Sequence, residues 1–210
     1  RFSFKCKNTE RVGVFADNNQ MYMIKVADII KLQAKKNTSK KGNGSGLIGR
    51  LSDKGIQIFE FCNMNGNENI LYMCCLEQII DKNLLFVTKH GQAKLVPGNN
   101  YDVLRKMIAA SKQEEDIIFI HDAEMEDFIV VKSMLGYYAR IQISEIPVKG
   151  KGAGCIRLVN ITDDDEIAAA EWFQTTYASN GSILTPADIA GIDPDEYNVV
   201  WVNIDRVGLA

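Results

Sequence analysis

Short segments in which apolar residues alternate with polar ones, or run together, recur along this chain between turn-forming residues. Such segments, rich in Val, Ile, Tyr and Phe, are typical of β-strands with one or both faces buried. The pattern therefore predicts an all-β protein. We expect strands at residues 2–7, 11–16, 21–26, 47–51, 56–62, 70–76, 84–88, 92–96, 104–110, 117–121, 127–133, 137–143, 167–173 and 198–204.

Some pairings follow from the turns between these segments. The first three strands are expected to form one sheet, and segments 56–62 and 70–76 are expected to form a hairpin around residues 63–67. Pro97 should end its strand because proline has no amide hydrogen for the ladder.

A turn followed by an acid or amide and then a bulky residue appears four times. The turns fall at Asn19, Gly91, Gly136 and Gly181, with intervals of 72, 45 and 45 residues. The acid or amide follows nine residues after each of the first three turns and seven after Gly181. A period of this length is typical of propeller-like repeats. We expect one domain, 1–210, with repeats at about 2–51, 56–110, 117–161 and 167–204, the last incomplete or irregular.

Composition adds limits. The chain has 210 residues, 46% of them hydrophobic, enough for a substantial core. No run of 18 apolar residues is present and the chain starts at Arg1, so neither a membrane span nor an intact secretory leader is expected, and the missing initial Met suggests a fragment. Five cysteines without a CxxC pair and two isolated histidines predict buried thiols in a reducing compartment, the cytoplasm, and no zinc site.

Charge is unevenly distributed. Residues 1–160 carry 23 Lys and Arg against 17 Asp and Glu, whereas the last 50 residues carry one basic residue against ten acids. Segment 31–50 holds six basic residues and no acid, among Asn, Ser, Thr and Gly. Such a loop suits phosphate groups, although a solvated connector has the same composition.

The pattern KGxGxG occurs twice, at residues 41–46 and 149–154, and each copy leads into an apolar strand that contains an arginine. Alternate glycines let the backbone pass close to a neighbour or ligand, and the lysines add positive charge there. Neither copy follows a βαβ unit, so a dinucleotide site is not indicated. The acids at 163–166 could ligate a cation, but their composition is that of a solvated turn.

Segments 85–94, 143–146 and 149–158, together with 6–10, resemble the C-terminal domain of the A subunit of bacterial type IIA topoisomerases, the group of DNA gyrase and topoisomerase IV. The resemblance extends from residue 2 to about 173. It implies a β-pinwheel, a disc of four-stranded blades that exchange strands, with about four blades here. It also implies a domain that bends double-stranded DNA around a basic rim and presents it to the catalytic core.

The resemblance implies further properties of the parent enzyme. Catalysis, ATP and Mg²⁺ would belong to the other domains of the A subunit and to the B subunit, which carries the ATPase, so this segment would carry no catalytic residue, cofactor or metal. Its location would be the bacterial cytoplasm, on the nucleoid. The QRRGGKG string of gyrase is absent, which leaves gyrase and topoisomerase IV open, and the acidic last 50 residues are unusual for a DNA-wrapping rim.

Basic residues in or beside the two glycine loops and on the repeats are the candidates for phosphate contact. They are Lys35, Lys36, Lys40, Lys41, Arg50, Lys94, Arg105, Lys106, Arg140, Lys149, Lys151 and Arg157. An alternative, favoured by the pI of 5.5, is a propeller-like protein-interaction scaffold without a nucleic-acid role. An enzyme with a Cys or His nucleophile is not indicated, because the sequence has no GxSxG, HExxH or GxxxxGK[ST] motif.

Overall fold

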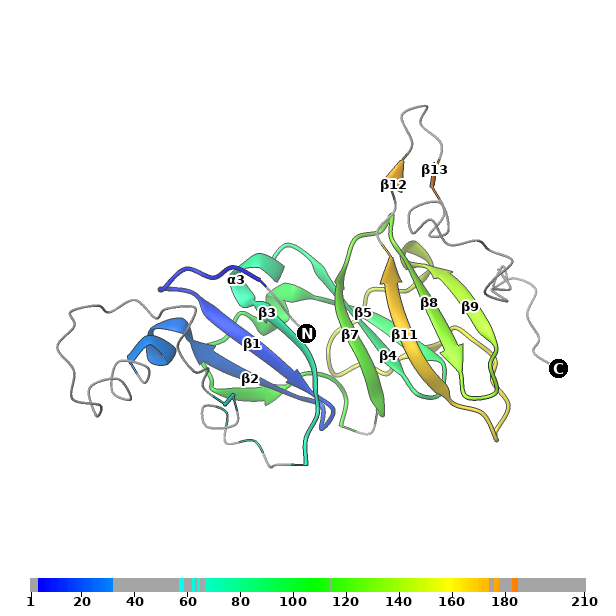
Figure 1. Cartoon of the computed structure of the whole chain (residues 1–210), viewed down its shortest axis with the longest axis horizontal. Coiled ribbons are helices and arrows are strands. Elements are labelled where there is room, and N and C mark those ends of the chain that lie inside the picture. Colours follow the sequence, from blue (N-terminus) through cyan, green and yellow to red (C-terminus); the bar gives the residue numbers. More distant parts are fainter. Residues whose placement is uncertain are drawn as a thin grey trace, which may run out of the picture.

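The part of the chain that the structure describes forms three antiparallel sheets and a two-stranded ribbon (Figure 1). The structure, a computed structural model, describes residues 4–31, 57–58, 62, 64, 67–113, 115–173, 176–177 and 183–184. Among these residues, no helix is long and apolar enough to span a bilayer.

The sheets are as follows. The first has the order β3-β1-β2-β6, with β1 (Arg11–Ala16), β2 (Gln20–Lys25), β3 (Ile70–Cys75) and β6 (Met107–Ala109). The second has the order β10-β5-β4-β7, with β4 (Asn83–Thr88), β5 (Gln92–Pro97), β7 (Ile117–Ala123) and β10 (Ile156–Arg157). The third contains β11 (Ile167–Phe173), β8 (Phe128–Ser133) and β9 (Tyr138–Gln142), and the ribbon pairs β12 (Thr176–Tyr177) with β13 (Ile183–Leu184).

The first two sheets are each built around one hairpin and borrow strands from further along the chain. Hairpin β1-β2 takes β3, which lies before the next hairpin, and β6, which lies after it. Hairpin β4-β5 takes β7 and β10 from the same relative positions around hairpin β8-β9. Because these sheets draw on two sequence repeats, they do not coincide with the repeats 56–110 and 117–161. We call the edge formed by β6 or β10 the exchanged edge.

The opposite edges of the sheets come together. Strand β7 packs against both β3 and β11. The edges formed by β3, β7 and β11, one from each sheet, therefore face a common region, and we call them the inner edges (Figure 1). In the first two sheets the exchanged edges lie on the opposite side, since β6 is at the other end of the strand order from β3, and β10 is at the other end from β7. The fold therefore separates an inner edge from an outer one.

Hairpin turns fall where the sequence predicts them. Asn19, Gly91 and Gly136 have φ angles of 60°, 69° and 89°, the left-handed region that tight hairpins require. A Cβ on Gly91 would also stand 2.9 Å from the Val159 carbonyl oxygen. The repeat pattern is thus confirmed at three turns, and the fourth, at Gly181, lies outside the described residues.

The core consists of apolar layers between consecutive sheets. Strand β4 shows why, because Leu84 and Phe86 face the first sheet while Leu85 and Val87 face the third. A further cluster, which includes Val14, covers the other face of the first sheet. A strand that is buried on both faces has a continuous run of apolar residues in its sequence, and residues 84–87 form such a run.

The bulky residue after each hairpin fills the core. Tyr101 ends the 3-10 turn η1 (Gly98–Tyr101), is fully buried, and donates a hydrogen bond to the Ala110 carbonyl at 2.7 Å. Ile146 follows the equivalent turn η2 (Ile143–Glu145) and is also buried. In the first copy residues 26–31 are helical. The repeated acid-or-amide pair therefore marks a helical turn that returns an apolar side chain to the core.

Several expected strands differ from the structure. Residues 4–7 form no strand, because β1 already pairs with β2 and β3 on its two sides. The expected hairpin of 56–62 with 70–76 is wrong, since β3 pairs with β1 and Cys62 is helical. Helix α3 (Leu76–Ile79) begins where that strand was expected to end. Expected strand 104–110 shortens to β6, and segments 47–51 and 198–204 lie outside the described residues.

Candidate nucleic-acid interface

Exposed cations gather at the exchanged edges of two consecutive sheets. Arg105 and Lys106 are exposed in the bend that leads into β6, and the Lys106 carbonyl accepts a hydrogen bond from Met23 on β2 at 2.8 Å. Arg157 is exposed on β10, the corresponding strand of the second sheet. Sequence-distant cations thus occupy equivalent places on neighbouring sheets.

The second KGxGxG loop projects from the same edge. Before the loop, the chain runs beside β5, where the Lys149 amide donates to the Leu95 carbonyl at 2.7 Å. After the loop, β10 pairs with β5 again through Ile156 and Ala93. Residues 149–154 are therefore an excursion anchored at both ends to one strand.

Lys94 determines how this loop is held, and it corrects one sequence expectation. Its side chain is 0% exposed, and its ammonium group donates to Glu115 at 2.8 Å and to the Lys151 carbonyl at 3.2 Å. It also donates to the carbonyl of Ala153. A cation with no exposed area and these partners cannot contact a phosphate, so Lys94 is not an interface residue but an internal support of the loop.

Glu115 completes that support, and sequence reasoning did not single it out. One carboxylate oxygen accepts from Lys94 and from the Ser111 hydroxyl, and the other accepts from the Cys155 amide at 2.6 Å. Burial favours a raised pKa for Glu115, but the bonds from Lys94, Ser111 and Cys155 outweigh it and lower the pKa. The sequence offered little indication of this buried role, because Glu115 stands between two other acids in an ordinary polar segment.

The glycines of the loop leave open space on its surface. A Cβ on Gly150 or Gly152 would meet no atom within 4 Å, so packing inside the protein does not require glycine at either position. Lys149 donates to the Gly154 carbonyl at 2.9 Å, which fixes its side chain across the loop. The loop therefore leaves its backbone open to a close approach and holds two lysines at the same place.

The cations of the exchanged edges differ in their partners from several other basic residues. Among the described residues, Arg105, Lys106, Lys151 and Arg157 form no ion pair. By contrast, several cations away from those edges are paired with carboxylates: Arg11 with Glu77 and Asp102, Lys82 with Asp122 and Glu124, and Lys89 with Asp116 and Glu166. Positive charge without an acidic partner in the described part of the chain is thus a feature that the two exchanged edges share.

The remaining candidates lie elsewhere. Arg140 is on β9, with its guanidinium 4.2 Å from the centre of the Phe128 ring. In the third sheet, β9 occupies the edge that corresponds to the exchanged edges of the other two. Lys35, Lys36, Lys40, Lys41 and Arg50 lie outside the described residues, as do the first KGxGxG loop and most of the acidic C-terminal segment.

Comparison with known proteins agrees with this architecture. Residues 82–116 and 127–171 match the family model described as the DNA gyrase C-terminal domain, β-propeller. Each matched segment begins at a hairpin. A curated relative, the A subunit of DNA topoisomerase 4 from Streptococcus pneumoniae serotype 4 (strain ATCC BAA-334 / TIGR4), is 32% identical over 111 residues, which cover 49% of this chain and 13% of the relative.

Solved structures show the same fold at low sequence identity. A crystal structure of the C-terminal domain of DNA topoisomerase IV aligns with a TM-score of 0.65 and 15% identity, over 80% of this chain and 48% of that one. The E. coli ParC C-terminal domain aligns with a TM-score of 0.58 and 13% identity, over 90% and 74%. Over residues 82–116 and 127–171 the chain therefore matches the family of DNA gyrase C-terminal domains, and its exchanged strands give it the β-pinwheel fold of the C-terminal domains of topoisomerase IV and ParC.

Proposed function

We propose that this chain binds and bends double-stranded DNA along its exchanged edges, as the C-terminal part of the A subunit of a type IIA topoisomerase. The observation that carries the proposal is that cations without an ion pair among the described residues occupy equivalent edges of two consecutive sheets, Arg105 and Lys106 on one and Lys151 and Arg157 on the next. Phosphates are contacted by such cations without any reading of bases.

Bending follows from the arrangement of the sheets. Consecutive sheets meet at their inner edges, so their exchanged edges diverge and a duplex that follows both must curve. Bending a segment of 20–30 base pairs costs about 1–6 kcal/mol, which several phosphate contacts have to offset. The rigid anchoring of loop 149–154 by Lys94 and Glu115 supports this role, because the loop is ordered before DNA arrives.

The parent enzyme gives the domain its context in this proposal. Its partners would be the other domains of the A subunit and the B subunit with its ATPase, which would use ATP and Mg²⁺ while this domain presents a DNA segment. The chain spans 13% of the curated relative it matches, so these partners and a cytoplasmic, nucleoid-bound location rest on the family match.

The test is a salt titration of duplex binding followed by fluorescence anisotropy. Replacing Lys149, Lys151 and Arg157 together with Ala should weaken binding and reduce the salt slope by about 0.9 for each phosphate that is no longer neutralised. Lys132→Ala is the matched control, since Lys132 is exposed on β8, the middle strand of the third sheet. An unchanged slope in the triple variant would contradict the proposal. The first KGxGxG loop is tested in parallel by adding Lys40→Ala and Lys41→Ala.

A protein-interaction scaffold is the second candidate, because one hairpin tip is apolar and exposed. Met134 and Leu135, in the turn between β8 and β9, are 69% and 59% exposed, and Tyr137 beside them is exposed as well. If the chain shows no salt-dependent affinity for duplex DNA, and Met134→Ser with Leu135→Ser abolishes capture of a purified subunit of the parent enzyme, the scaffold function replaces the DNA-binding one.

A further inference from the structure

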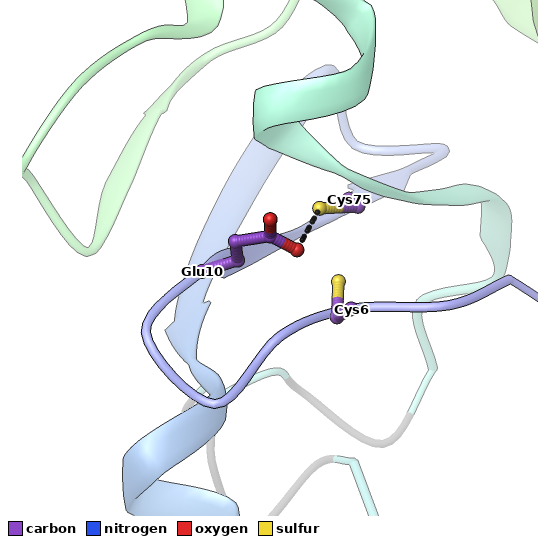
Figure 2. A group of neighbouring side chains, drawn as sticks. All are labelled: Cys6, Glu10 and Cys75. Atoms are coloured by element: carbon purple, nitrogen blue, oxygen red, sulfur yellow. Dashed lines mark hydrogen bonds between the residues drawn. The ribbon is translucent and has the colours of Figure 1, made fainter.

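Two thiols and a carboxylate converge at the start of the first sheet. The ligand atoms of Cys6, Glu10 and Cys75 all lie within 4.8 Å of one another, and Cys75 Sγ is 3.3 Å from Glu10 Oε2. Figure 2 shows both sulfur atoms and the carboxylate pointing into one space. Cys75 is fully buried, while Cys6 and Glu10 are partly exposed, which leaves a route from solvent.

The backbone holds these side chains together. A turn closes between Lys7 and Glu10, with the Glu10 amide donating to the Lys7 carbonyl at 3.0 Å and the Lys7 amide donating to Glu10 Oε2 at 2.7 Å. This turn brings Cys6 and Glu10 to the same side. The antiparallel register pairs Val12 with Cys75, so the thiol of Cys75 lies beside the segment that precedes β1. Three ligands from two distant segments are thereby set in place.

We propose that Cys6, Cys75 and Glu10 form a binding site for a thiophilic divalent cation of the Zn²⁺ type. Thiolate sulfur and carboxylate oxygen bind Zn²⁺ at about 2.3 Å and about 2.0–2.2 Å, and a tetrahedral centre sets its ligand atoms roughly 3.5–3.8 Å apart. The separation of 3.3 Å between Cys75 Sγ and Glu10 Oε2 is close to those values, and the other separations are no more than 4.8 Å, so side-chain rotations can bring the three atoms around one ion. The exposed side of the cluster leaves the fourth position to water.

Glu77 is a neighbour of the site rather than a ligand. Its Oε2 lies 3.5 Å from Cys75 Sγ, but Oε1 accepts from Arg11 Nε at 2.7 Å and Oε2 accepts from the Arg11 amide at 3.0 Å. Both oxygens are therefore engaged by one arginine. Partners of this kind fix the orientation of ligands in metal sites.

Protons compete with a metal ion for these two thiols. Burial raises the pKa of Cys75 far above its ordinary value, and burial also raises the pKa of Cys6. Thiols with raised pKa are poor nucleophiles for oxidation and exchange. A cation can still displace their protons, and its affinity should then rise with pH.

The site would fasten residues 4–10 to the first sheet at the start of α3. In the described structure this segment forms no strand, and Gln78 reaches it with a hydrogen bond of 2.8 Å to the Lys5 carbonyl. Residue spacing did not indicate a zinc site, because Cys6 and Cys75 are 69 positions apart in the chain. This inference does not depend on DNA binding.

Cobalt substitution tests the proposal on the whole chain after removal of metals with a chelator. We expect one equivalent of Co²⁺ to give a thiolate-to-cobalt charge-transfer band and intense visible bands, and Zn²⁺ to displace it. Cys6→Ser and Cys75→Ser should each abolish the charge-transfer band or halve it, and Glu10→Gln should weaken binding roughly tenfold or more. Cys155→Ser is the matched control, since Cys155 also adjoins a glutamate but has no second thiol in its cluster among the described residues.

Three further readouts decide the outcome. Circular dichroism without metal establishes that each variant is folded, and Zn²⁺ should raise the melting temperature of the wild type but not of Cys6→Ser. Duplex affinity should be the same in Cys6→Ser and wild type, which separates this proposal from the proposed function. A chain that gives no thiolate band, a full band in Cys6→Ser, or a Cys6–Cys75 disulfide formed in glutathione buffer would overturn the metal site.

Discussion

The ammonium nitrogen of Lys94 lies 2.8 Å from a carboxylate oxygen of Glu115, and the two side chains are 0% and 8% exposed. This ion pair joins β5 to the segment before β7 and, through further hydrogen bonds, to loop 149–154. In the sequence Lys94 resembles a surface cation. In the structure it is a buried side chain that anchors the loop proposed to bind DNA.

Lys94→Met should destabilise the chain by about 3–5 kcal/mol, because it leaves the Glu115 carboxylate buried without its cation. Urea denaturation followed by circular dichroism measures the decrease in unfolding free energy. The double variant Lys94→Met with Glu115→Gln should be less destabilised than Lys94→Met alone, since no unpaired charge remains. Equal destabilisation of both would argue against a strong coupling.

Acid should weaken the contribution of Glu115. Burial favours a higher pKa for Glu115, but its hydrogen bonds prevail and hold the pKa below the ordinary value of 4.5. Folding thus favours the charged form, so the stabilisation is complete above pH 4.5 and is lost as pH falls through the lowered pKa. The difference in unfolding free energy between wild type and Glu115→Gln should shrink below that pH, and a constant difference would refute the linkage.

Bending of DNA should require both exchanged edges. Replacing Arg105 and Lys106 with Ala should leave part of the duplex affinity, because Lys151 and Arg157 remain, but should abolish most of the bend. Energy transfer between dyes at the two ends of a duplex measures the bend independently of affinity. A variant that binds less tightly but bends DNA fully would show that one edge suffices.

Gly98→Ala should be strongly destabilising, by several kcal/mol or to the point of insolubility. A Cβ there would stand 1.8 Å from the Ile79 carbonyl oxygen and 3.1 Å from that of Lys82, and both are backbone atoms that cannot move aside alone. Gly152→Ala is the matched control, because its Cβ would meet nothing within 4 Å. Thermal melting compares the two, and similar melting temperatures would contradict the predicted clash.

Tyr72→Phe should reduce stability by about 1–3 kcal/mol, since the Tyr72 hydroxyl donates to the partly buried Asp122. This bond joins the inner edges of the first two sheets, β3 and β7, and Lys82 binds the other oxygen of Asp122 at 3.0 Å. Chemical denaturation measures the change. Tyr22→Phe is the control for loss of a tyrosine hydroxyl that does not join two sheets, because the Tyr22 hydroxyl bonds to Asn18 and Glu68, within the first sheet and the loops of that sheet.

Much of the fold was predictable because local chemistry determines it. The turns at Asn19, Gly91 and Gly136 need residues that tolerate positive φ, and the apolar runs on either side need burial, so hairpins follow directly from sequence. The buried Tyr101 and Ile146 were visible as a repeated spacing. The resemblance to a pinwheel family was likewise visible in short local segments, such as residues 85–94 and 149–158.

What the sequence determined by itself was the hairpin repeat and, together with the glycine loops, the resemblance to a family; what only the tertiary structure decided was which strands and which charges come together. Strand exchange pairs β6 and β10 with hairpins of earlier repeats, and no local pattern specifies a partner so far along the chain. The same holds for Lys94 and for the Cys6, Glu10 and Cys75 cluster, because burial and proximity arise from packing between segments, which residue type and spacing do not encode locally.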